Sequence, residues 1–396
     1  MNKKITVSTS INDLIPLSVP EIKGNEWKYI KECLDTNWVS SVGSYVDQFE
    51  NAVADYVGRG YGVACVNGTS ALHVALLLSG IKSQEEVLLP ALTFVAPANA
   101  ICYTGAKPVF IDVDLDNWQI DTGKILGFLK KECKYQKGKL INKNTGRVIK
   151  AIMPVHILGH PADMDAIMSI ARKYKLKVIE DAAEGLGSAY KNRPLGISGD
   201  IACFSFNGNK ILTTGGGGMV VVDKKSWSDR ARYLITQARN NVLENIHNEI
   251  GYNYRLTNIQ AAMGFAQMEQ LDKFVEKKRD IARRYNEQLK DVPGIGLPKE
   301  ASWAKSNYWL YTIFVDRAKY RIDSRALLEK LKRSNIQTRP LWHPLHSLKP
   351  FKKCFSYKIK VANKLYKNCL SLPSSVGLTK SDQKKVIDII KRSRSL

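Results

Sequence analysis

The sequence predicts an α/β protein whose mostly parallel, doubly wound sheet is followed by a smaller C-terminal α+β domain. Short apolar segments typical of buried strands alternate with helical stretches from residue 61 to about 223. A long helical pattern then spans 256–289, and the remaining segment contains one clear strand and two helices. A chain of 396 residues is long enough to bury a large and a small core. We expect a large domain with N-terminal helices over 1–255, a bridging helix over 256–289 and a small domain over 290–396.

The predicted elements begin with two helices over 25–36 and 45–56, separated by a loop at Trp38. The strand candidates of the large domain are 62–66, 87–89, 109–111, 149–155, 178–179, 201–206 and 219–222. Residues 164–174 repeat apolar side chains at spacings of three and four, as a helix covering a sheet does. The small domain should contain a strand over 308–315 and helices over 325–334 and from 381. The lysine-rich interval 130–147 is interpreted as an exposed insertion.

A formal net charge of +23 makes nucleic-acid binding a rival hypothesis. The lysines are spread along the whole chain, however, and no known nucleic-acid module is recognised. We interpret the charge mainly as a solvated surface, with a component that steers a phosphorylated metabolite, and expect no nucleic-acid partner.

The seven cysteines include no CxxC pair, so they are interpreted as reduced thiols and not as a disulfide or zinc framework. No apolar run reaches membrane-spanning length, and residues 1–10 lack a leader pattern. We expect a cytoplasmic protein with no metal and no membrane partner.

The first candidate functional residue is Lys210, in the stretch 205–210 (SFNGNK) between the apolar runs 201–204 and 219–222. Small and polar residues, followed by four glycines at 215–218, predict a tight loop between two strands. A lysine held in such a loop can act as an amine nucleophile. The lysine alone is a weak signal, because most lysines of this chain are surface charges.

A second signal is the apolar run 177–181 (KVIED), which ends in two carboxylates. Ligands of open α/β sheets bind at the carboxyl ends of strands. An aspartate there, Asp181, suits pyridoxal phosphate chemistry, in which a carboxylate keeps the pyridinium nitrogen protonated while a lysine holds the aldehyde. The alternative is that Asp181 only caps a following helix.

A third signal is the strand, turn and apolar helix around residues 62–79, with Gly68 and Thr69 at the turn. A helix N-terminus offers free N–H groups and a positive dipole end, which together bind phosphate. The segment has neither the Walker nor the GxGxxG spacing, so a cofactor monophosphate is favoured over a nucleotide.

With these motifs together, the chain resembles the fold-type I pyridoxal phosphate enzymes, and among them the DegT/StrS family of sugar-nucleotide aminotransferases. The resemblance covers nearly the whole chain. The opening segments 16–20 (PLSVP), 24–27 (GNEW) and 38–43 (WVSSVG) look most like the LegC-like branch of C4 aminotransferases.

The resemblance implies a role for each matching residue. Lys210 forms a Schiff base with pyridoxal 5'-phosphate, and Asp181 pairs with the pyridinium nitrogen. Glu184, where many members have glutamine, lies near the cofactor's phenolic oxygen. The remaining matches are Phe94, which stacks on the ring or else only packs in the core, the phosphate ligands Gly68, Thr69 and Ser205, and Asn253, which reaches the phosphate of a neighbouring subunit. The resemblance therefore implies a homodimer with shared sites.

The implied function is transfer of an amino group from glutamate to the C4 ketone of a UDP-linked 4-keto-6-deoxy-N-acetylhexosamine, on a route to legionaminic acid or bacillosamine. The alternatives are another nucleotide-linked 4-keto-6-deoxy sugar, with dTDP or GDP, and a non-catalytic regulatory binder of the same fold. A lysine at 210 favours transamination, because the family's deoxygenating variant has histidine there. We expect the carbohydrate pocket to be formed by the loops 38–41, 156–160 and 339–346, where His343 and His346 are more typical of packing or surface histidines.

Overall fold

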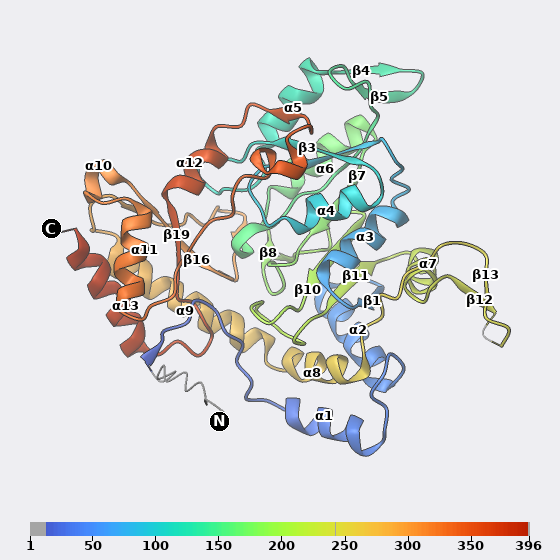
Figure 1. The fold of residues 1–396 in the computed structure, drawn as a ribbon, viewed down its shortest axis with the longest axis horizontal. Coiled ribbons are helices and arrows are strands. Elements are labelled where there is room, and N and C mark those ends of the chain that lie inside the picture. Colours follow the sequence, from blue (N-terminus) through green and yellow to red (C-terminus); the bar gives the residue numbers. More distant parts are fainter. Residues whose placement is uncertain (1–12, 242, 395–396) are drawn as a thin grey trace, which may run out of the picture.

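The computed structural model describes residues 13–241 and 243–394 (Figure 1). Its centre is an eight-stranded sheet in the order β1-β11-β10-β7-β6-β2-β3-β18. The strands are β1 (Tyr61–Cys65), β2 (Glu86–Pro90), β3 (Lys107–Ile111), β6 (Ile149–Ile152), β7 (Lys177–Asp181), β10 (Ile201–Ser205), β11 (Gly218–Val222) and β18 (Ser356–Tyr357). Strand β11 is antiparallel to both neighbours, and the other neighbouring pairs are parallel. The predicted mostly parallel sheet is confirmed.

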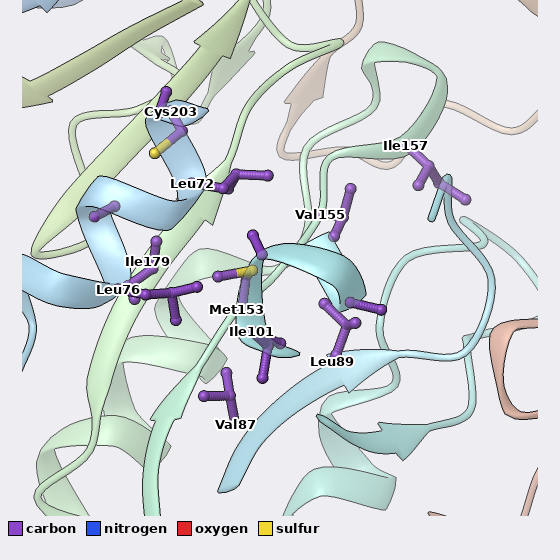
Figure 2. Close-up of a cluster of buried hydrophobic side chains, with 14 of the residues drawn as sticks. Leu72, Leu76, Val87, Leu89, Ile101, Met153, Val155, Ile157, Ile179 and Cys203 are labelled. Atoms are coloured by element: carbon purple, nitrogen blue, oxygen red, sulfur yellow. The ribbon is translucent and has the colours of Figure 1, made fainter. Parts of the chain in front are cut away.

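Helices cover both faces of this sheet. They are α3 (Gly68–Leu78), α4 (Ala96–Tyr103), α5 (Thr122–Lys131), α6 (Met164–Tyr174) and α7 (Lys225–Ile235). Figure 2 shows Leu72, Leu76 and Ile101 of α3 and α4 packed near Val87 and Ile179 of the strands. Successive strand residues point to opposite faces, and Leu88 accordingly packs in a second core with residues of α5 and α6. The sheet is therefore doubly wound.

The helical pattern over 256–289 forms two helices, α8 (Asn258–Met268) and α9 (Leu271–Leu289), so the single predicted bridging helix is wrong. The N-terminal helices α1 (Glu26–Asp35) and α2 (Ser44–Val57) pack against α8. The second half of α9 instead buries side chains such as Tyr285 and Leu289 in the small-domain core. The change of core falls within α9, because Leu271, Phe274 and Val275 at its start still pack in the core that α8 shares.

The small domain has a four-stranded antiparallel sheet, in the order β14-β16-β19-β17, with four helices. Its elements are β14 (Ile295–Gly296), β16 (Tyr311–Val315), β17 (Arg339–Pro340), β19 (Cys369–Leu372), α10 (Arg317–Tyr320), α11 (Ser324–Arg333), α12 (Val361–Asn368) and α13 (Lys380–Ser393). The predicted strand over 308–315 begins only at Tyr311. Tyr308 has a positive φ of 48°, and the Asn307 side chain accepts the backbone N–H of Trp309, so the chain turns there.

The C-terminal segment returns to the large sheet before the chain ends. Strand β18 pairs with β3, although it lies beyond the predicted domain boundary at 290. Next to it, the buried Asp112 accepts hydrogen bonds from the backbone N–H groups of Lys360, Val361 and Ala362. The backbone pairing therefore assigns residues 356–357 to the large sheet.

The remaining elements are short. They are the hairpins β4 (Cys133–Gln136) with β5 (Lys139–Asn142) and β12 (Arg239–Asn241) with β13 (Ile246–His247), a sheet of β15 (Ala304–Lys305), β8 (Ala189–Tyr190) and β9 (Arg193–Pro194), and the 3₁₀ turns Ile157–Gly159, Leu345–Ser347 and Lys349–Phe351. The lysine-rich interval 130–147 contains the β4–β5 hairpin, which extends from the large domain and has Leu140 and Asn142 buried (Figure 1). Across 13–241 and 243–394, no helix is both long and apolar enough to span a membrane.

Candidate active site

A cavity of about 400 Å³ lies between the carboxyl ends of the large-sheet strands and the small domain. Seven of the eight predicted site residues line it: Gly68, Thr69, Phe94, Asp181, Glu184, Ser205 and Lys210. Asn253 does not. The structure therefore brings together residues that are up to 142 positions apart in the sequence (68 to 210).

Lys210 lies in the loop between β10 and β11, as predicted. Its side chain is 13% exposed, and its Nζ lies 3.3 Å from Oε1 of Glu184. On another side, Nζ lies 3.9 Å from the centroid of the Trp309 ring. An ion pair and a cation–π contact hold the amine at the cavity wall.

Asp181 ends β7 and is 3% exposed. Its Oδ1 accepts a hydrogen bond of 3.1 Å from the Ala183 N–H, and a turn follows, so the alternative reading as a helix cap is wrong. Burial raises the pKa of Asp181, against the opposing charge of Lys210. A cationic N–H group bound next to this carboxyl would favour its ionised form.

Glu184 is also buried, and burial raises its pKa while the Lys210 ammonium acts in the opposite direction. Its Oε2 accepts a hydrogen bond of 2.7 Å from the Leu158 N–H. Glu184 thus has a fixed orientation towards Lys210.

The N-terminus of α3 forms the third part of the cavity wall. The Asn67 side chain caps the helix by accepting the Ser70 N–H at 2.8 Å. A Cβ at Gly68 would lie 2.8 Å from the Ser205 Cβ, and one at Gly218 would lie 2.7 Å from the Gly68 N. Glycines let the backbone approach the helix end this closely, which leaves room for an anion at the first N–H groups.

Phe94 and Asn253 differ in their relation to the cavity. Phe94 lines the cavity and is 54% exposed, so the alternative of core packing is wrong for this residue. Asn253 is exposed and its backbone pairs with Thr236. Its predicted phosphate contact would have to be made to another copy of the chain and remains a prediction.

The sequence analysis did not identify Trp309 as part of the site, whereas Trp342 falls in the predicted loop 339–346. Trp309 and Trp342 both line the cavity, with nearly parallel rings whose centroids are 6.4 Å apart. The Trp309 indole N–H donates a 2.6 Å hydrogen bond to the carbonyl of Asn209. The one available signal was the Trp309 position at the start of a predicted strand, which does not indicate where the strand packs.

Of the three loops predicted for the carbohydrate pocket, one lines the cavity substantially. It contributes Arg339, Pro340, Leu341 and Trp342, whereas the loop 156–160 contributes only Leu158 and the loop 38–41 contributes nothing within this chain. His156 points instead at Glu180, with 3.0 Å between His156 Nε2 and Glu180 Oε2, and both side chains are fully buried. In the third loop, His343 is exposed and bonds to Ser347, while His346 is partly buried.

Comparison with known proteins assigns the chain to a family. A sequence profile of the DegT/DnrJ/EryC1/StrS aminotransferase family matches residues 20–391. The chain belongs to this family.

Three of its relatives show how far the likeness extends. The chain is 40% identical to a GDP-perosamine synthase of Escherichia coli O157:H7, covering 92% of the chain and 94% of the relative. It is 39% identical to the putative pyridoxal phosphate-dependent aminotransferase EpsN of Bacillus subtilis, over 95% of each. A crystal structure of a DegT DnrJ EryC1 StrS aminotransferase from Brucella abortus superposes with a TM-score of 0.85 at 28% identity, covering 94% and 96% of the two chains.

The predicted family and fold-type I architecture are therefore confirmed, and the cofactor is pyridoxal phosphate. The residues of the cavity fit this cofactor. Asp181 offers a carboxylate to the ring nitrogen, Lys210 offers an amine to the aldehyde, and the cradle of Gly68 and Ser205 offers an anion site.

Proposed function

We propose that this aminotransferase moves an amino group from glutamate to the C4 ketone of a nucleotide-linked 4-keto-6-deoxy sugar. The observation that supports it best is the convergence of the Lys210 amine, the Asp181 carboxylate and the α3 N-terminus on one cavity. Chemically different groups from three separate strand ends meet there.

Each residue then has a defined task. Gly68, Thr69 and Ser205 hold the phosphate, and Asp181 keeps a proton on the ring nitrogen. When bound, the cofactor supplies an electron sink for the carbon that loses or gains a proton. Lys210 would hold the cofactor at its aldehyde and would supply the amine that moves the proton as general acid and base. Glu184 orients the Lys210 amine.

The sequence analysis and the names of the relatives indicate different nucleotides. The opening segments favoured a UDP-linked N-acetylhexosamine, whereas relatives at 40% and 37% identity are named GDP-perosamine synthases. These names favour the alternative, and we propose a GDP-linked sugar ahead of a UDP-linked one. Activity of the purified enzyme with glutamate and a panel of GDP-, UDP- and dTDP-linked 4-keto-6-deoxy sugars distinguishes them. Preference for a UDP-linked N-acetyl sugar would restore the first reading.

We further propose a homodimer with shared sites. Asn253 is exposed, and the nearby apolar side chains of Leu243 and Ile250 are 93% and 83% exposed. Exposed apolar side chains of this size are typical of an interface. Light scattering of the purified protein should give twice the mass of 44.4 kDa, and a monomeric mass would contradict the shared site.

The proposed chemistry is tested by Lys210→Ala, with Lys82→Ala at an exposed position as the matched control. The wild type and the control should absorb near the visible edge, and glutamate should bleach that band. Lys210→Ala should lose turnover by at least about a thousandfold, because the covalent link and the proton carrier are removed together. A wild-type protein that is colourless and takes up no pyridoxal phosphate would refute the proposal.

A further inference from the structure

A second lysine, Lys278 on α9, is buried beneath the cavity wall. It is 2% exposed, which is unusual for a lysine. Its Nζ donates hydrogen bonds to two backbone carbonyls, Trp309 O at 2.8 Å and Ser374 O at 2.6 Å. Among the described residues, no carboxylate forms an ion pair with Lys278.

The arrangement matches the hydrogen-bonding capacity of a neutral amine. A neutral amine has two N–H donors, and the two carbonyls accept both, whereas an ammonium would keep a third N–H to satisfy. Burial lowers the pKa of Lys278 to about 7, in agreement with this count.

The two carbonyls belong to segments that meet again at Asn209, the residue before Lys210. On one path, Trp309 donates its indole N–H to Asn209 O at 2.6 Å and places its ring 3.9 Å from the Lys210 Nζ. On the other, the Ser374 N–H donates to Leu17 O at 2.8 Å, and the neighbouring Ser18 hydroxyl donates to the same Asn209 carbonyl at 3.2 Å. Lys278 is the point where these two paths join on the side away from the cavity.

We propose that Lys278 is a positioning residue for the reactive loop: by holding the Trp309 and Ser374 carbonyls together, it fixes Asn209 and the direction of the Lys210 amine. This role deepens the proposed function, since the catalytic consequence requires Lys210 to be the reactive amine. The link from Lys278 to Asn209 does not require it.

The test compares Lys278→Met, which keeps the length and apolar stem but donates no hydrogen bond, with Lys277→Met at the exposed neighbouring position. For the protein as purified, we expect hydrogen exchange at the amides of 207–210 to accelerate in Lys278→Met and to stay unchanged in Lys277→Met. We also expect kcat to fall about tenfold with KM for both substrates within about twofold, because a misdirected amine slows proton transfer without removing binding contacts.

A double-mutant cycle shows whether Lys278 acts through the tryptophan. Trp309→Phe removes the indole N–H and retains an aromatic ring. If Lys278 acts through Trp309, the effects of Lys278→Met and Trp309→Phe on kcat should be clearly less than additive. Additive effects, or unchanged exchange at 207–210, would overturn the proposal and leave Lys278 as a core residue only.

Two further outcomes are separated by design. Should Lys278→Met fail to fold, Lys278→Leu, which likewise donates no hydrogen bond, takes its place in the same exchange and kinetic comparisons. Should the wild type bind no pyridoxal phosphate, the proposed function fails, while the exchange data still decide the link between Lys278 and Asn209.

Discussion

The two sides of the cavity are built in different ways. On the large-domain side, Asp181 ends β7, Lys210 follows β10 and Gly68 begins a helix, so the backbone of the sheet sets their positions. On the small-domain side, Trp309, Arg339 and Trp342 reach the cavity from short segments of another sheet. The first side has the groups for cofactor chemistry, and the second has the aromatic and cationic surface expected to meet a sugar nucleotide.

The largest effect that would test this contrast is expected for Asp181→Asn. The amide preserves the size of the side chain but cannot carry the negative charge that keeps a ring nitrogen protonated. We expect kcat to fall by about a thousandfold with the cofactor still bound. Steady-state kinetics together with the cofactor content of the purified variant provide the measurement. A fall in kcat of less than tenfold would mean that the large-domain side does not supply the main catalytic groups.

The second test concerns Asp112, which connects the end of β3 in the large sheet with the start of α12. Burial alone would raise the pKa of Asp112, but the Lys124 ammonium at 2.7 Å and the backbone N–H groups of residues 360–362 outweigh it and lower the pKa. A carboxyl with a lowered folded pKa stabilises the protein above its unfolded pKa, and the stabilisation is lost as the pH falls through the folded pKa.

We therefore expect Asp112→Asn to lower the free energy of unfolding by about 3 kcal/mol at pH 7. The difference from the wild type should shrink as the pH falls below about 4, the unfolded value. Urea unfolding at a series of pH values measures both, with Asp388→Asn on α13 as the control. If the difference in the free energy of unfolding does not vary with pH, the charge of Asp112 does not contribute to stability.

A smaller effect is expected for Gly68→Ala, because its Cβ would lie 2.8 Å from the Ser205 Cβ and displace the phosphate cradle. The rate of cofactor loss should rise about tenfold, as expected when one or two charge-assisted hydrogen bonds are weakened. Gly127→Ala is the control, since the nearest atom to its Cβ would be at 3.5 Å. Equal cofactor retention in the two variants would mean that the phosphate does not bind at the α3 N-terminus.

The smallest effect is expected on the small-domain side, from Arg339→Ala. Arg339 is exposed at the cavity, and a guanidinium there suits the diphosphate of a nucleotide sugar. We expect KM for the nucleotide sugar to rise about fivefold with kcat unchanged, the signature of a lost binding contact. Arg333→Ala, exposed on α11, is the control. A fall in kcat with unchanged KM would place Arg339 in the chemical step.

The same contrast explains what the sequence could predict. Lys210, Asp181 and Gly68 each lie at a strand end or helix start that can be recognised from a few neighbouring residues, and all three line one cavity. Trp309 could not be assigned this way, because its place depends on how the small domain packs. The break between α8 and α9 was missed because the residues on both sides of it continue a helical pattern and pack in the same core.

The identity of the nucleotide could not be predicted from the N-terminal segments 16–20, 24–27 and 38–43. Residues 38–41 lie outside the cavity of this chain, so a resemblance there says little about the groups that would contact the base.

The return of β18 to the edge of the large sheet restricts how this enzyme can open. The chain leaves the large domain along α9 and returns to it where β18 pairs with β3 and where Asp112 binds the backbone of residues 360–362. Only then does β19 complete the small sheet. A hinge rotation of the small domain as one body would have to break that second attachment.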